Sequence, residues 1–156
     1  MSYCFDTSPL SALFRNYYRG VFKTLWKDFE ELVEEGNILS TREVSREIEG
    51  SNIESLRDWA KANQAIFATP TADEGKFVAG IFAVRHFQNN IEGKKLLNGG
   101  FVADPFVVAR AALNGATVVT METLKPNAAD IPNICEHFKI KHLSLEKFME
   151  EEGWEF

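Results

Sequence analysis

Residues 104–120, with the sequence DPFVVARAALNGATVVT, contain a complete transition from a helix to a strand. Asp104 and Pro105 are typical of a helix start, because Asp caps the first turn and Pro is tolerated at the first helical position. Gly115 ends the apolar helical pattern, and residues 116–121 then read as a strand rich in Val and Thr. A helix that leads directly into such a strand indicates an α/β protein.

A carboxylate follows an apolar run at three distant places in the chain. In an open α/β sheet, ligands bind at the carboxyl ends of the strands. Several carboxylates held there repel one another, and a divalent cation relieves that repulsion. The pattern therefore predicts a Mg²⁺ or Mn²⁺ site and phosphate chemistry. The three acidic residues are Asp6 after residues 3–5, Asp104 after residues 101–103, and Glu122 after residues 116–121.

Strands and helices alternate along the rest of the chain, which predicts an α/β three-layer sandwich with a mostly parallel central sheet. We expect one domain over residues 1–156. Further strands are expected at residues 2–5, 37–39 and 140–143, and a turn at residues 7–9. Helices are expected around residues 22–33, 43–50, 53–60, 73–99 in two pieces with breaks at Gly93 and Gly99–Gly100, 133–138, and 144–153 with Ser144 as its cap.

The start of the helix after residue 39 carries two acidic residues. Ser40 and Glu43 fit an S-x-x-E capping box, and Leu39 and Val44 occupy the hydrophobic-staple positions. Glu43 and Glu47 lie one helical turn apart and share a side of that helix. Because the capping box already explains Glu43, Glu47 is the better candidate for a metal ligand.

Each of the other carboxylates also has a purely structural interpretation. Asp6 precedes Thr7 and Ser8, so a turn is the alternative to a functional role. Asp104 is explained by helix capping alone, and Glu122 by a solvated strand end.

Composition narrows the class of partner. The hydrophobic content of 45% and charged content of 26% are those of a soluble globular protein, and a net charge of −6 argues against a large basic surface for nucleic acid. Basic side chains are nevertheless grouped locally, so that an RNA contact would be small. They recur at helical spacing at Arg15, Arg19, Lys23 and Lys27.

The sequence shows neither a transmembrane segment nor a signal peptide, which predicts a cytoplasmic protein without a membrane partner. Cys4 and Cys135 are expected to be reduced core residues rather than a disulfide. Searches for G-x-x-x-x-G-K-[ST], G-x-G-x-x-G and G-x-S-x-G find nothing, and the spacing of His137 and His142 does not fit a zinc protease helix.

Taken together, these motifs resemble those of the PIN-domain ribonucleases, the family that includes the VapC-type toxins. Residues 3–10 (YCFDTSPL) resemble the family's strand followed by D-T-[NS]-x-L, and Glu47-Ile48 resembles its second, acidic motif. Residues 104–120 resemble D-x-x-[IL]-A-x-A followed by a strand that ends in Thr. The chain is particularly similar to a PIN-like subgroup of uncharacterised bacterial proteins with V-T-x-E-T. In this chain Glu122 stands where most PIN nucleases have the Asp of T-x-D.

The resemblance implies a Mg²⁺- or Mn²⁺-dependent endoribonuclease that acts as the toxin of a toxin–antitoxin pair, forms a homodimer and binds a cognate antitoxin. It assigns Asp6, Glu47, Asp104 and Glu122 to the catalytic pocket, with Asp6, Asp104 and Glu122 as metal ligands. Thr7, Ser8 and Thr120 would bond the carboxylates or the substrate phosphate, and Glu43 would support them.

Two other functions fit the sequence. One is a PIN-like module without catalytic activity that binds metal or a protein partner. The replacement of the usual Asp by Glu122 and the acidic net charge favour this function. The other is a phosphatase or phosphotransfer domain. The absence of a second Asp near Asp6 counts against this function.

Overall fold

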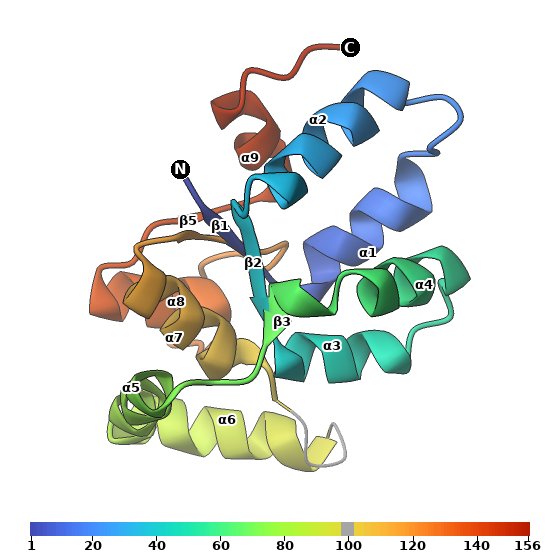
Figure 1. Ribbon diagram of the computed structural model, residues 1–156. Helices are drawn as coiled ribbons and strands as arrows, with labels where there is room; N and C mark the ends of the chain where they lie inside the picture. Colours follow the sequence, from blue (N-terminus) through green and yellow to red (C-terminus); the bar gives the residue numbers. More distant parts are fainter. Residues whose placement is uncertain (98–101) are drawn as a thin grey trace.

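The strands form a parallel sheet at the centre of the molecule (Figure 1). The computed structural model describes residues 1–97 and 102–156. Within them the sheet has five strands in the order β3-β2-β1-β4-β5, and each neighbouring pair is parallel. The predicted α/β architecture is confirmed, with a sheet that is parallel throughout. The strands are β1 (Tyr3–Phe5), β2 (Ile38–Thr41), β3 (Phe67–Ala68), β4 (Thr117–Val119) and β5 (His142–Leu143).

Helices cover both faces of this sheet (Figure 1). Helices α1 to α4 lie on one side, while α7 packs against β1, β2 and β4 on the other and is itself covered by α5 and α8. The helices are α1 (Thr7–Asn16), α2 (Lys23–Glu34), α3 (Arg42–Glu49), α4 (Glu54–Ala62), α5 (Ala72–Phe82), α6 (Arg85–Leu97), α7 (Asp104–Asn114), α8 (Ile131–Phe138) and α9 (Leu145–Glu151), with a 3₁₀ turn at Gln64–Ile66.

Strand β1 shows how the sheet is buried on both faces. Tyr3 and Phe5 point to the same side, where their rings make edge contacts with Phe148 of α9, and Phe5 also contacts Phe29 of α2. Cys4 points to the opposite side, where its Sγ lies 3.5 Å from the carbonyl oxygen of Val107 in α7. A strand covered on both faces must be apolar at every position, which explains the unbroken run before Asp6.

The strand order places β1 between β2 and β4. From β1 the chain moves outward to β2 and β3, and it then returns to β4 and continues to β5 on the other side. Such a reversal opens a crevice at the carboxyl ends of the two central strands. Asp6 follows the end of β1, and Thr120 and Glu122 follow the end of β4, so all three lie at this crevice.

The turn predicted at residues 7–9 is wrong, because α1 begins at Thr7. The first backbone N–H groups of a helix have no partner within it, so Pro9 breaks no helical hydrogen bond in this first turn. Asp6 occupies the N-cap position. The strand therefore passes directly into a helix, which fixes the backbone on both sides of the Asp6 carboxylate.

The predicted capping box at the start of α3 is also wrong. Thr41, not Ser40, is the N-cap, and its side chain accepts the N–H of Val44. Ser40 belongs to β2 and donates a hydrogen bond of 2.7 Å to the carbonyl oxygen of Phe5. Because the N-cap is one residue later than predicted, Leu39 is not at the staple position and Glu43 is not at the capping-box position.

Two further boundaries differ from the prediction. Helix α7 begins at Asp104 with Pro105 second, so Asp104 is a first-turn residue and Ala103 takes the cap position. Gly93 lies inside α6 rather than breaking it, and the divide between α5 and α6 falls at residues 83–84. The breaks expected at Gly99 and Gly100 lie outside the described residues. The edge strand β3 was not predicted.

In the described part of the chain, no helix has the length and apolar character needed to cross a membrane. Cys4 and Cys135 are buried free thiols, as predicted.

Candidate active site

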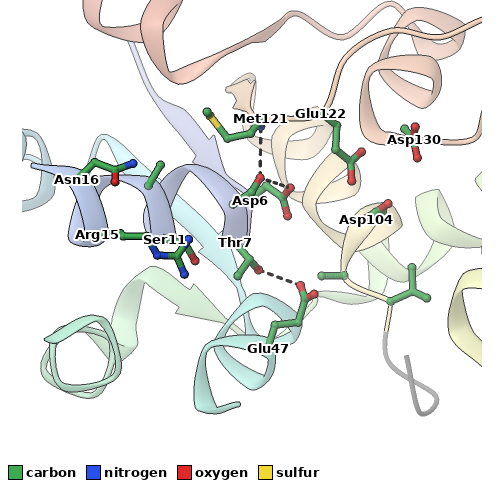
Figure 2. Close-up of a pocket in the computed structure, with 14 residues that line it drawn as sticks. Asp6, Thr7, Ser11, Arg15, Asn16, Glu47, Asp104, Met121, Glu122 and Asp130 are labelled. Carbon is green, nitrogen blue, oxygen red and sulfur yellow. Dashed lines mark hydrogen bonds between the residues drawn. The ribbon is translucent and has the colours of Figure 1, made fainter. Parts of the chain in front are cut away.

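An open cavity of about 800 Å³ lies at the carboxyl end of the sheet (Figure 2). Asp6, Glu47, Asp104 and Glu122, which come from four separate parts of the chain, all line it. Thr7 and Ser8 line it as well. The structure therefore brings the four acidic side chains singled out from the sequence to one cavity.

Asp6 lies deepest among them, with an exposed fraction of 5%. Its Oδ2 accepts hydrogen bonds from the hydroxyls of Thr120, at 3.1 Å, and Ser8, at 3.4 Å. The Ser8 hydroxyl in turn accepts the N–H of Met121, and the Thr120 hydroxyl accepts that of Glu122. The two hydroxyls thus tie the Asp6 carboxylate to the end of β4 and hold it in one orientation.

The environment of Asp6 makes its ionisation unfavourable. Burial, together with the negative charges of Asp104, Glu122 and Glu47, raises the pKa of Asp6 to about 7, against the lowering effect of a hydrogen bond from the N–H of Thr7. Asp104 contributes most among the neighbouring charges. The carboxylates therefore lie close enough to repel one another, as expected of groups that share a binding site.

Glu47 lies at the exposed rim of the cavity, on the last turn of α3. Its Oε1 accepts a hydrogen bond of 2.9 Å from the hydroxyl of Thr7 (Figure 2). Partial burial and the nearby Asp104 raise the pKa of Glu47, while the bond from Thr7 lowers it. The hydroxyl of Thr7 thus holds a second carboxylate in the cavity.

Glu43 is a buried side chain on the same helix and is not among the described residues that line the cavity. Arg42 donates to its Oε1 at 2.8 Å, and Arg46 lies 4.0 Å away. Its Oε2 has no hydrogen-bond partner in the described part of the chain. The capping argument was wrong, but the structure places Glu47, and not Glu43, among the described residues that line the cavity. The preference for Glu47 as a metal ligand stays a prediction.

Glu122 reaches across the cavity to α8. Its Oε2 accepts the backbone N–H of Ile131, the first residue of that helix, at 2.8 Å. The first N–H groups of a helix need such acceptors, and a carboxylate there also interacts favourably with the helix dipole. The longer Glu at this position therefore fixes the start of α8, a role that a solvated strand end would not have.

Eight further described residues line the cavity and were not assigned to the site from the sequence: Ser11, Ala12, Arg15, Asn16, Val102, Ala103, Met121 and Asp130. Asp130 precedes α8 as its N-cap, so that the cavity contains a fifth carboxylate. The signal for it was present, because Asp130-Ile131-Pro132 is an acidic residue before a proline-containing helix start, as at Asp104-Pro105. Ser11 and Arg15 follow from the helical periodicity of α1, which the expected turn had hidden.

The donor atoms of the cavity fit a hard divalent cation, because Mg²⁺ and Mn²⁺ prefer carboxylate oxygens. Within residues 1–97 and 102–156, no three His, Cys, Asp or Glu side chains are arranged to hold one ion together. The fit is therefore to an ion bound by one or two carboxylates, with water and phosphate oxygens as its remaining ligands, as is usual for Mg²⁺. Among the neighbouring charges, that of Asp104 acts most strongly on Asp6, which makes these two carboxylates the first candidates for direct ligands.

Thiols and imidazoles, the other common catalytic groups, do not line this cavity in the described part of the chain. Burial raises the pKa of Cys135 to about 12 and also raises that of Cys4, so both thiols stay protonated and unreactive. Neither a cysteine nor a histidine is among the described residues that line the cavity. The polar side chains among the described lining residues are carboxylates, hydroxyls, the amide of Asn16 and the guanidinium of Arg15.

No curated protein sequence matches the chain. A solved structure with a similar course of the chain is that of VapBC2 from Rickettsia felis bound to a DNA fragment from their promoter. The TM-score is 0.49 at 12% sequence identity, and the match covers 92% of this chain and 98% of that chain. A family model matches residues 3–156, and the protein accordingly belongs to the family described as a domain of unknown function, DUF4411.

Proposed function

We propose that this protein is a Mg²⁺- or Mn²⁺-dependent endoribonuclease and that the carboxylate cavity is its active site. The observation that carries the proposal is the meeting of Asp6, Glu47, Asp104 and Glu122 in one cavity, with the pKa of Asp6 raised to about 7. The order of these residues along the chain, which resembles that of the PIN-domain ribonucleases, supports it.

In this proposal Asp6 and Asp104 bind the cation directly, and Glu122 and Glu47 complete the acidic pocket through the ion or through water. When bound, the cation supplies activation of a water molecule and stabilisation of charge on the phosphate. Thr120 and Ser8 hold Asp6 in the orientation in which its oxygens face the cavity, and Thr7 does the same for Glu47. Burial favours the protonated form of Asp6, whereas a cation binds the ionised form. Cation binding must therefore displace the proton.

Cleavage of RNA by the purified protein tests this function. We expect wild-type protein to cleave single-stranded RNA with Mn²⁺ and to lose activity with EDTA. Asp6→Asn should lower the rate by about 10²-fold or more, and Glu47→Gln by about tenfold or more, since ligand and supporting carboxylates commonly have effects of this size. Glu43→Gln is the matched control, because it removes a charge from the same helix outside the described cavity lining.

Cleavage that survives EDTA, or that is equal in wild type and Asp6→Asn, would contradict the proposal. If the nuclease acts as a toxin, expression of the wild type should also arrest bacterial growth, and Asp6→Asn should relieve the arrest. A cognate antitoxin and a homodimer belong to the same proposal and would be detected by co-purification and by the mass of the protein in solution.

One observation favours a second function, a PIN-like module that binds metal or a protein without cleaving RNA. Glu122 bonds the start of α8 through one of its oxygens, which gives this acidic residue a structural role. Wild-type protein that is stabilised by Mn²⁺ but leaves RNA intact under all conditions would establish this alternative.

A further inference from the structure

Among its described lining residues, the cavity has one positively charged side chain, which lies opposite the acidic end. Arg15, near the end of α1, is the only cation among the described residues that line it, alongside five carboxylates. In the described part of the chain no carboxylate lies within ion-pair distance of its guanidinium. An exposed arginine near so many carboxylates, yet paired with none of them, is available to bind an anion.

Asp6 stands at the start of α1, and Arg15 lies near the other end of this helix. Ser8, Ser11 and Arg15 follow at spacings of three and four residues, so they form one stripe along the helix, and all three line the cavity. Figure 2 shows Ser11 and Arg15 together on α1, on the side of the cavity away from Asp104 and Asp130. At 1.5 Å per residue, Arg15 lies roughly 13 Å from Asp6 along the helix axis. The acidic and basic ends therefore serve different parts of a ligand.

The other basic residues of this region do not share this position. Arg19 is held by an ion pair of 3.0 Å with Glu30 and by stacking at 4.0 Å over the ring of Trp26. Lys23 and Lys27 lie on α2 and are not among the described residues of the cavity. The four residues that recur at helical spacing in the sequence are thus divided among α1 (Arg15), the turn that follows it (Arg19) and α2 (Lys23 and Lys27). Of these four, only Arg15 lines the cavity.

We propose that Arg15 binds a backbone phosphate next to the one held at the carboxylates, which rests on the proposed ribonuclease function. The site then takes a polynucleotide strand with at least two consecutive phosphodiesters, and not a mononucleotide or a phosphomonoester. A guanidinium suits this role because it stays charged at all relevant pH values and its planar donors match phosphate oxygens. The hydroxyl of Ser11 lies between the two ends and is polar without adding charge.

Binding of a fluorescently labelled single-stranded oligoribonucleotide in EDTA tests the contact without cleavage. Arg15→Gln should weaken binding about fivefold at low salt, the effect of one exposed ion contact. It should also reduce the dependence of log K on log salt by about 0.7, as for one phosphate contact on a single strand. Arg15→Lys should restore the salt dependence. Lys27→Gln, which removes an equal charge on α2, should change neither quantity.

Kinetics separate this contact from the reaction itself. With Mn²⁺, Arg15→Gln should raise KM for the oligoribonucleotide at unchanged kcat, and it should leave hydrolysis of bis(p-nitrophenyl) phosphate, which has a single phosphate, at the wild-type rate. Equal losses on both substrates would place Arg15 at the reacting phosphate and overturn the proposal, as would a Lys27→Gln variant that weakens binding as much. RNA binding that depends on Arg15 without any cleavage would reject the nuclease but support the phosphate contact. Cleavage by Arg15→Gln with the wild-type KM would support the nuclease but reject the phosphate contact.

Discussion

Asp6 shows how a single residue can serve both the fold and the site. It follows the last residue of β1, occupies the N-cap of α1 and presents a buried carboxylate to the cavity. A buried charge costs free energy unless it is paired, and the hydroxyls of Thr120 and Ser8 compensate only partly for lost water. The raised pKa is the measure of the remaining cost, and it is the kind of perturbation that is concentrated at functional sites.

This cost predicts how stability depends on pH in the absence of metal. The pKa of Asp6 is about 7 in the folded protein and about 3.9 in an unfolded chain, so folding favours the protonated form between these values. The contribution of Asp6 to the free energy of unfolding is therefore fully present below about pH 4 and is lost as the pH rises through about 7. Its amplitude should be on the order of a few kcal/mol.

Urea unfolding in EDTA between pH 5 and pH 8 measures this effect, with both limits bracketing about pH 7. Asp6→Asn should lose most of the gain in stability that the wild type shows as pH falls, because Asn does not titrate. Asp58→Asn, an exposed substitution on α4, should keep the wild-type dependence. Identical pH profiles for wild type and Asp6→Asn would show that Asp6 is ionised throughout this range.

At this scale the sequence supplied the principal acidic residues, because each follows an apolar run or a helix signal that can be recognised locally. It could not supply Arg15 or Asp130 as cavity residues. Their membership depends on where α1 and the start of α8 lie relative to the sheet, which is a property of packing. Glu43 was given a capping role for a local reason, and the structure instead buries it beside Arg42.

Among the elements, α8 connects the fold most directly with the site. Its first N–H, at Ile131, is satisfied by Glu122, and its N-cap residue Asp130 lines the same cavity. The start of this helix therefore depends on a residue that is also proposed to complete the acidic pocket.

Substitutions at Glu122 should separate these two roles. Glu122→Ala removes the acceptor for the N–H of Ile131 and should lower the free energy of unfolding by about 0.5–2 kcal/mol, as for loss of a helix cap. Glu122→Gln keeps an acceptor oxygen and should retain most of that stability, while it loses the charge that attracts a cation. Urea unfolding and RNA cleavage of both variants check this. If Glu122→Gln were as unstable as Glu122→Ala but fully active, the bond to Ile131 would require the charge and the acidic role would be refuted.

The elements that the sequence did not predict share a physical cause. Pro9 and the hydroxyl residues Thr7 and Ser8 fit the first turn of a helix as well as a loop, so the start of α1 could not be recognised from the sequence. Ser40 and Thr41 are both good caps, and only the register of β2, which uses Ser40 to bond Phe5, decides between them. Strand β3 spans Phe67–Ala68, too short for any periodicity.

For the whole molecule, the alternation of strands and helices was sufficient to predict a parallel α/β sheet. The order β3-β2-β1-β4-β5 was not predictable in the same way, because strand neighbours are set by long-range packing such as that of α7 against β1, β2 and β4. That order places the ends of β1 and β4 side by side. The acidic residues of distant segments therefore meet because of the topology, and each of them alone would have only a local structural explanation.

The measurement that tests the central claim most directly is the thermal stability of the protein as a function of Mn²⁺ concentration at neutral pH. A cation that binds only the folded state stabilises it by mass action, by about 2.7 kcal/mol when its concentration is a hundred times Kd. We predict that Tm of the wild type rises with Mn²⁺, that Asp6→Asn and Asp104→Asn lose most of the rise, and that Asp58→Asn keeps it. A wild-type Tm that does not change up to millimolar Mn²⁺, or a rise that is equal in all four proteins, would contradict a cation site formed by these carboxylates.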